Sequence, residues 1–204
     1  DGMGGHQAGE VASKMVIDYI NNYNFDMSTD LILQIDEAIN DINYNIIKAS
    51  QDNPEYNNMG TTLSLGIIYE NKLFIGHIGD SRIYIFRDKT LQQLTKDHTL
   101  VQELLKQNRI EEEEAFDHPQ RHILMQALGV DVEIEIESSI IPLKKKDILL
   151  FCTDGISDML RFKKIKNIVS EYKSDISVLS RKLGEAAIAS GGKDNLTVIT
   201  GIIY

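Results

Sequence analysis

Residues 62–94 read TLSLGIIYENKLFIGHIGDSRIYIFRDKTLQQL, and this stretch decides the fold class. It consists of short runs rich in β-branched residues, in which the apolar pattern has a period of two. The pairs Glu70-Asn71, Gly79-Asp80 and Asp88-Lys89, which are typical of turns, separate the runs. The pattern predicts an antiparallel meander of four strands with tight turns, over residues 62–69, 72–78, 81–87 and 90–94.

Helical patterns lie on both sides of these strands. Apolar residues recur at helical spacing over 9–21, and a longer repeat starts after Thr29-Asp30 and ends near Asn53-Pro54. Further helices are expected around 99–106, 162–171 and 174–189, and strands over 132–140, 147–152 and 196–203. Residues 148–152 are continuously apolar, as in a strand buried on both faces. Helices at both ends of antiparallel strands predict a layered α+β sandwich rather than a doubly wound parallel fold.

Composition excludes several classes of protein. The chain has 204 residues without a Gly/Ser-rich linker or repeat, so we expect a single domain over 1–204. Its one cysteine, Cys152, excludes a disulfide framework and favours a reducing compartment, hence the cytoplasm. The net charge of −10 disfavours nucleic acid and anionic membranes as partners. No apolar run approaches the ~18 residues of a membrane span.

Aspartates at the ends of predicted strands are the candidate functional residues. Asp1, Asp80, Asp154 and Asp194 each lie at a turn or beside a glycine. Each one alone is most simply a turn residue. Antiparallel strands could, however, bring several of these ends to one edge of the core. Clustered carboxylates need a cation there, and hard oxygen ligands select Mg²⁺ or Mn²⁺.

Seven motifs in order cover nearly the whole chain. They are DGMGGHQAGE (1–10), GTT (60–62), GDSRIY (79–84), LTKDH (94–98), QALG (126–129), TDGISD (153–158) and GGKDNLTVI (191–199). Together they closely resemble the bacterial branch of the metal-dependent Ser/Thr protein phosphatases, the PPM family. The resemblance implies a four-layer α-β-β-α sandwich, with two antiparallel sheets flanked by helices and metals at one end of the sheets. It also implies that the region from about 97 to 127 is the family's flap beside the catalytic cleft.

The resemblance implies a function as well. We expect hydrolysis of phosphoserine and phosphothreonine in proteins by a metal-activated water, without a phosphoenzyme intermediate. The expected cofactors are two catalytic Mn²⁺ or Mg²⁺ ions, with a weaker third ion as in bacterial members. The expected partners are phosphorylated proteins that Ser/Thr kinases produce, and the expected state is a monomer. A catalytically impaired or regulatory module of the same fold is the alternative, and a hydrolase of small phosphorylated molecules is a weaker one.

The motifs assign roles to individual residues. Asp1 matches the carboxylate that bridges the two catalytic metals, and the Gly2 backbone carbonyl matches a ligand of the second. Asp154 and Asp194 match ligands of the first metal, and Asp80 matches a ligand that holds the third metal together with Asp154. Cations at these residues would also neutralise the phosphoryl group, despite the acidic chain.

His6 is the candidate general acid, because it lies close to Asp1 in sequence and protonation assists the departure of an alkoxide. Some family members carry that histidine directly after Asp-Gly, where this chain has Met3, so a contact at a helix start is an equal alternative. The other histidines, His77, His98, His118 and His122, show no metal-ligand spacing. The run Glu111–Glu114 is most simply a solvated face, with the choice of basic substrates as the alternative.

The sequence departs from the family at its start. It begins at the first motif, so we expect the chain to lack the family's preceding strand segment, with its phosphate-binding arginine and Asn-Glu-Asp motif. Arg82 or Arg121 could replace that arginine, but no pattern favours either. A cysteine-dependent phosphatase is excluded because the residue six positions after Cys152 is Asp158 rather than arginine.

Overall fold

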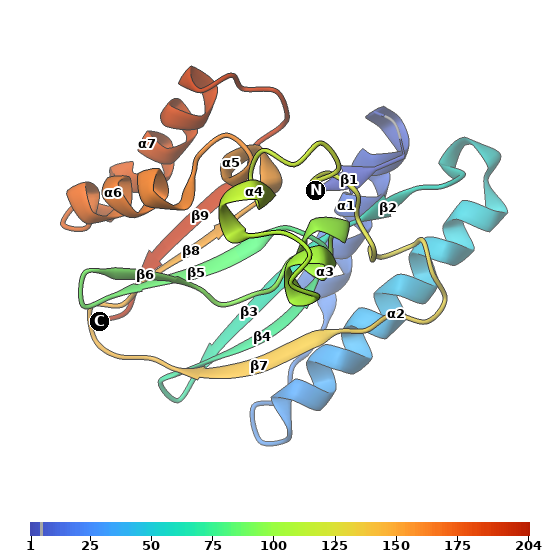
Figure 1. Ribbon diagram of the computed structural model, residues 1–204. Helices are drawn as coiled ribbons and strands as arrows, with labels where there is room; N and C mark the ends of the chain where they lie inside the picture. The colour runs from blue at the N-terminus through green and yellow to red at the C-terminus, as the bar shows by residue number, and fades with distance from the viewer. Residues whose placement is uncertain (5) are drawn as a thin grey trace.

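The computed structural model describes residues 1–4 and 6–204, apart from the side chains of residues 6 and 7. Two antiparallel sheets lie face to face between pairs of helices (Figure 1). One sheet has the order β3-β4-β7, with β3 at Leu63–Tyr69, β4 at Lys72–Ile78 and β7 at Glu137–Pro142. The other has the order β6-β5-β8-β9, with β5 at Arg82–Arg87, β6 at Thr90–Gln93, β8 at Ile148–Cys152 and β9 at Val198–Ile202. The predicted four-layer sandwich is confirmed.

Long helices form the outer layers. Helices α1 (His6–Asn22) and α2 (Leu31–Asp52) cover the first sheet, and α6 (Phe162–Tyr172) and α7 (Ile176–Ala189) cover the second (Figure 1). The shorter elements are β1 (Gly2–Met3), η1 (Pro54–Tyr56), β2 (Gly60–Thr61), α3 (Leu100–Lys106), α4 (Glu112–Ala115) and α5 (Asp154–Ser157). Asp30 caps α2 as predicted, because its carboxylate accepts hydrogen bonds from the backbone N–H groups of Ile32 and Leu33. Within the described residues, no helix is long and apolar enough to cross a membrane.

Apolar side chains fill each space between layers. Ile35 and Ile39 of α2 pack so tightly on β4 that a Cβ at Gly76 would lie 2.3 Å from Ile35 Cγ2. Ile75 and Leu149 belong to the cluster between the two sheets. The central strand β8 is buried on both faces, as its continuous apolar run predicted. Three stacked layers of contacts therefore hold the strand ends in fixed positions.

The predicted single meander of four strands is wrong. The β3–β4 hairpin continues to β7 in one sheet, whereas the β5–β6 hairpin pairs through β5 with β8 in the other. The turn at Gly79–Ser81 crosses between the sheets. Gly79 has a φ of +103°, and a Cβ there would lie 2.5 Å from Thr62 Cγ2. The physical reason is that β4 and β5 each carry buried residues on both faces, which one open sheet could not cover. The strand predicted over 132–140 also begins later, at Glu137.

Candidate active site

The register of the strands brings three of the candidate aspartates to the same end of the second sheet. Cys152, the last residue of β8, pairs with Arg82 at the start of β5 and with Val198 at the start of β9. Asp154 follows β8, Asp80 precedes β5 and Asp194 precedes β9. All three therefore lie just beyond the same end of the sheet. This is the clustering that the sequence could suggest but not demonstrate.

Within this acidic cluster, Asp80 is buried and Asp154 is half-buried, whereas Asp194 is exposed. Asp80 and Asp154 each have one carboxylate oxygen, Oδ1, that is buried without a hydrogen-bond partner in the described part of the chain. A buried carboxylate oxygen without a partner is costly. A cation bound between the two side chains would remove that cost, and hard divalent ions favour such oxygen donors.

The pKa values of Asp80 and Asp154 also show that ionisation of these carboxylates is unfavourable without a cation. Burial, followed by the negative charges of Asp80, Asp158 and Asp194, raises the pKa of Asp154 to about 7. Burial, followed by the charge of Asp97, raises the pKa of Asp80 to about 6, although Arg82 opposes the shift. Carboxylates held close together where ionisation is unfavourable are typical of a functional site that binds a cation.

Gly155 explains how Asp194 reaches this cluster. A Cβ at Gly155 would lie 2.1 Å from the Asn195 carbonyl oxygen, so glycine allows the loop at Asn195 to touch α5. The Thr197 N–H also donates to Thr153 Oγ1 at 3.0 Å, and the Thr153 N–H donates to the Thr197 carbonyl at 3.1 Å. Asp194 itself is exposed, but its charge acts on Asp154.

Asp1 lies beside the same carboxylates. Its carbonyl oxygen accepts hydrogen bonds from the Thr62 N–H at 2.9 Å and from Thr61 Oγ1 at 2.8 Å. The backbone nitrogen of Asp1 lies within electrostatic range of the Asp154 and Asp80 carboxylates. The strands β1 and β2 thus hold Asp1 next to the acidic cluster.

Two further sequence-predicted residues belong to the segment after Asp1. Gly2 packs against α1 so closely that a Cβ on it would lie 2.0 Å from the Gly9 carbonyl oxygen. A Cβ on Gly9 would in turn lie 2.5 Å from the Gly2 carbonyl oxygen, so neither position accepts a side chain. The side chain of His6, the candidate general acid, lies outside the described residues.

A cleft of about 420 Å³ contains the buried carboxylates. Its lining includes Asp80, Asp154 and Asp158, and α3, α4 and the segment that follows them contribute Leu105, Glu113 and Arg121. The start of α6 completes the wall with Arg161 and Lys163. The cleft therefore combines acidic side chains with basic ones in a single lining.

Arg82 and Arg121, which both line the cleft, differ in how fully their guanidinium groups are paired with carboxylates. Arg82 Nε lies 2.9 Å from both carboxylate oxygens of Asp97, and its Nη2 contacts the same side chain, so its guanidinium already has an anionic partner. Arg121 Nε donates to Asp158 Oδ2 at 3.2 Å, where His122 Nδ1 also approaches to 3.2 Å. Arg121 is the less fully paired of the two arginines that the sequence left open.

Asp158 is a cleft residue that the sequence reasoning missed. It ends the short helix α5, four residues after Asp154, and its charge raises the pKa of Asp154. The spacing of four residues places both carboxylates on one side of a helical turn, and this signal could have identified it. Cys152, by contrast, is buried at the end of β8, and burial raises the pKa of its thiol to about 12, so it packs in the core rather than acting as a nucleophile.

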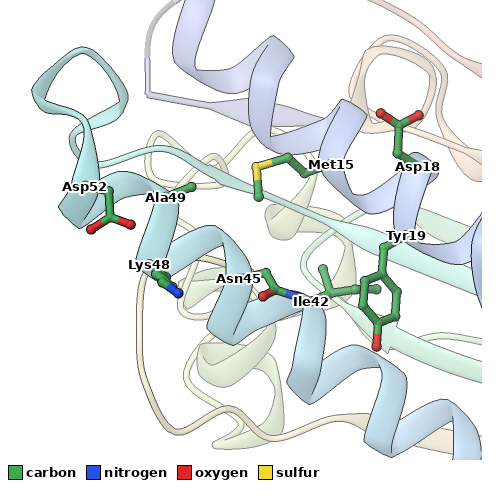
Figure 2. A pocket seen from close by; sticks show the side chains of 8 residues that line it. All are labelled: Met15, Asp18, Tyr19, Ile42, Asn45, Lys48, Ala49 and Asp52. Atoms are coloured by element: carbon green, nitrogen blue, oxygen red, sulfur yellow. The ribbon is translucent and has the colours of Figure 1, made fainter.

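A second hollow, also of about 420 Å³, lies between α1 and α2 (Figure 2). Its lining mixes the apolar side chains of Met15 and Ile42 with Asp18 and Lys48. The two hollows share no lining residue among those described, so the acidic cluster is separate from this one.

A four-layer sandwich with buried carboxylates beyond the strand ends is the arrangement of the metal-dependent protein phosphatases. The family model for protein phosphatase 2C matches residues 1–187, and the chain belongs to this family. The serine/threonine phosphatase stp of Listeria welshimeri is 35% identical over 204 residues, an alignment that covers 98% of this chain and 81% of stp.

Solved structures agree with this assignment. The serine/threonine phosphatase PstP/Ppp of Mycobacterium tuberculosis has a TM-score of 0.92 and 38% identity, over 100% of this chain and 86% of that one. The catalytic domain of PstP in complex with two manganese ions has a TM-score of 0.86 and 36% identity, over 98% of this chain and 84% of that one.

Proposed function

We propose that this protein hydrolyses phosphoserine and phosphothreonine in other proteins, as a metal-dependent phosphatase that forms no phosphoenzyme. The observation that carries the proposal is the pair of buried, unpartnered carboxylate oxygens of Asp80 and Asp154 in the cleft. Retaining such a pair without a cation would be costly, which argues against a purely regulatory module. The relatives named as serine/threonine phosphatases support the substrate class.

The residues present fit Mn²⁺ or Mg²⁺. Asp1, Asp80, Asp154, Asp194 and the Gly2 carbonyl would hold the ions, and all of these donors are oxygen atoms, which both metals prefer. When bound, such ions lower the pKa of a water molecule enough to supply hydroxide at neutral pH. A structure described with two manganese ions, the PstP catalytic domain, supports this cofactor.

The chain's own residues position the phosphoryl group and its leaving group. Arg121 and Lys163 would offset the charge of the phosphate in the cleft. Two contacts position the Arg161 side chain in the cleft lining. Its guanidinium lies 4.3 Å from the centroid of the Phe116 ring, and its Nη2 donates to Asp117 Oδ2 at 2.6 Å. His6 would donate a proton to the departing serine or threonine oxygen.

We also propose that the chain acts as a single domain with residues 97–127 as its flap, and as a monomer in the cytoplasm on products of Ser/Thr kinases. The position of α3 and α4 on the wall of the cleft supports a role for this segment in contacting substrate.

Phosphate release from a phosphothreonine peptide tests the function directly. Activity should require Mn²⁺ or Mg²⁺, disappear with excess chelator, and be lost in Asp154→Asn. The variant Asp18→Asn, which changes an exposed carboxylate on α1, should retain activity and serves as the matched control. Undiminished turnover in chelator, with the metal shown to be absent, would contradict the proposal.

A further inference from the structure

Three metal-binding side chains meet outside the acidic cluster. His77 lies near the end of β4, His98 lies between β6 and α3, and Glu137 begins β7. One ligand atom from each lies within 4.8 Å of the other two. The rings of His77 and His98 have centroids 5.0 Å apart. Segments from three parts of the chain therefore bring two imidazoles and one carboxylate together.

His77 is fully buried, and both of its ring nitrogens face oxygen atoms. Nδ1 lies 2.9 Å from Ser64 Oγ, and Nε2 lies 3.1 Å from the Lys96 carbonyl oxygen. The Ser64 hydroxyl also lies 2.9 Å from the Ser81 carbonyl oxygen. A serine hydroxyl has only one proton to donate, so it can serve either Ser81 or His77.

With a neutral His77 ring, neither direction of the Ser64 hydroxyl proton gives every hydrogen-bonding group a partner. If Ser64 donates to the Ser81 carbonyl, Nδ1 must carry the imidazole proton, and the lone pair of Nε2 then faces the Lys96 carbonyl. If Ser64 donates to Nδ1 instead, the Ser81 carbonyl loses that donor. A cation at Nε2 satisfies every group at once, because Nδ1 then donates to Ser64, Ser64 donates to Ser81, and Nε2 and the Lys96 oxygen both face the cation.

We infer that His77, His98 and Glu137 bind one transition-metal ion, for which Zn²⁺ is the best match. Two imidazole nitrogens and one carboxylate form a donor set typical of Zn²⁺ sites, and imidazole selects against Mg²⁺. The Lys96 carbonyl oxygen lies close enough to Nε2 to act as a further ligand. This site shares no residue with the acidic cluster, and it adds imidazole nitrogens to oxygen donors.

The surroundings support metal binding by each ligand. The Ser64 hydroxyl holds the distal nitrogen of His77, and the Lys96 N–H donates to Glu137 Oε2 at 2.7 Å. Such hydrogen bonds orient metal ligands. The Gly79 N–H contacts His98 Nδ1 at a long 3.3 Å, which a rotation of that partly exposed ring would release. Because the three ligand atoms already lie within 4.8 Å of one another, small side-chain movements would bring them to the distances of about 2.0–2.2 Å that Zn²⁺ requires.

The position of the site suggests what the ion does. It would tie β4, the 96–98 segment and β7 together immediately before Gly79–Ser81, the turn that carries Asp80. Asp97, next to His98, holds Arg82 on the other side of this turn. A bound ion would therefore fix the turn on which one carboxylate of the acidic cluster depends, and it would stabilise the fold without taking part in hydrolysis.

The test uses the full chain carrying Asp154→Asn, so that binding at the acidic cluster is weakened. Titration with Co²⁺ should give one equivalent with the intense visible absorption of a nitrogen- and oxygen-ligated, four-coordinate ion, and Zn²⁺ should displace it and raise the Tm. Adding His98→Ala or Glu137→Gln should weaken Zn²⁺ binding by ~10²-fold, since even outer contacts contribute 10- to 100-fold. Adding His118→Ala, in the segment between α4 and β7, should change nothing.

Three results would overturn the proposed Zn²⁺ site. Equal Zn²⁺ affinity with and without His98→Ala would overturn the inference, and so would the absence of Co²⁺ absorption from the folded protein. A metal-free chain whose His77 ring carries two protons at neutral pH, seen by ¹⁵N NMR, would show that a proton fills this place and would also overturn it. None of these results bears on phosphate release at the acidic cluster, so the proposed function is tested separately.

Discussion

Replacing Asp154 by Asn should stabilise the metal-free protein at neutral pH while abolishing its activity. The pKa of Asp154 is near 3.8 in the unfolded chain and about 7 in the folded protein, so the folded state binds this proton more tightly. Stability is therefore lost as the pH rises from 3.8 through about 7, and the full cost is present above that range. At 1.36 kcal/mol for each pKa unit, the cost is about 4 kcal/mol.

Partial access of solvent to Asp154 and relaxation of its neighbours reduce this cost to about 2 kcal/mol. For a chain of this size, that corresponds to a Tm increase of about 4–8 °C for the variant. The assay is a thermal melt of metal-free wild type, Asp154→Asn and the control Asp18→Asn between about pH 5 and about pH 8. The gap between wild type and Asp154→Asn should widen with pH, and Asp18→Asn should follow the wild type.

Addition of Mn²⁺ should reverse the order, because the wild type gains binding energy that Asp154→Asn has lost. The reasoning is refuted if the metal-free variant melts below the wild type at the upper end of this pH range, or if the gap narrows as the pH rises. Equal stabilisation of both proteins by Mn²⁺ would refute the assignment of Asp154 as a ligand.

Three further outcomes are expected. Asp194→Asn should abolish turnover at limiting Mn²⁺ yet leave the metal-free Tm nearly unchanged, because this carboxylate is exposed; parental kcat would contradict its role. Gly155→Ala should lower the Tm and raise the Mn²⁺ requirement, since its Cβ would lie 2.1 Å from the Asn195 carbonyl; an unchanged Mn²⁺ titration would show that the loop is not held there. His6→Ala should slow hydrolysis of a phosphoserine peptide by ~10²-fold and of an aryl phosphate much less; equal losses would indicate positioning instead.

Local chemistry explains which elements could be predicted. The strand at Lys72–Ile78 and the start of α2 after Asp30 follow from alternation and capping, which depend on nearby residues alone. The Gly79-Asp80 pair suits a hairpin and a crossover equally well. Only the partners β7 and β8, which lie much later in the chain, decide that β4 and β5 belong to different sheets.

In the candidate site, too, nearby residues predict some features, whereas others depend on distant parts of the chain. Glycine neighbours and strand ends identified Asp80, Asp154 and Asp194, but their convergence depends on the register of β5, β8 and β9. The ion pair of Arg82 with Asp97 could not be predicted either, because it requires the loop after β6 to return beside β5. Tertiary packing, rather than any local pattern, creates the distances that matter for chemistry.

The crossing of the chain between the two sheets at Gly79–Ser81 has a consequence for unfolding. Asp80 lies on this connection directly before β5, and Asp154 directly follows β8, so the pairing of β5 with β8 keeps the two carboxylates close together. An ion shared by Asp80 and Asp154 would act as a reversible crosslink between distant parts of the chain. Such a crosslink disfavours partly open states in which β5 and β8 have separated at this end. With the ion bound, the turn at Gly79–Ser81 and the end of β8 would open together rather than independently.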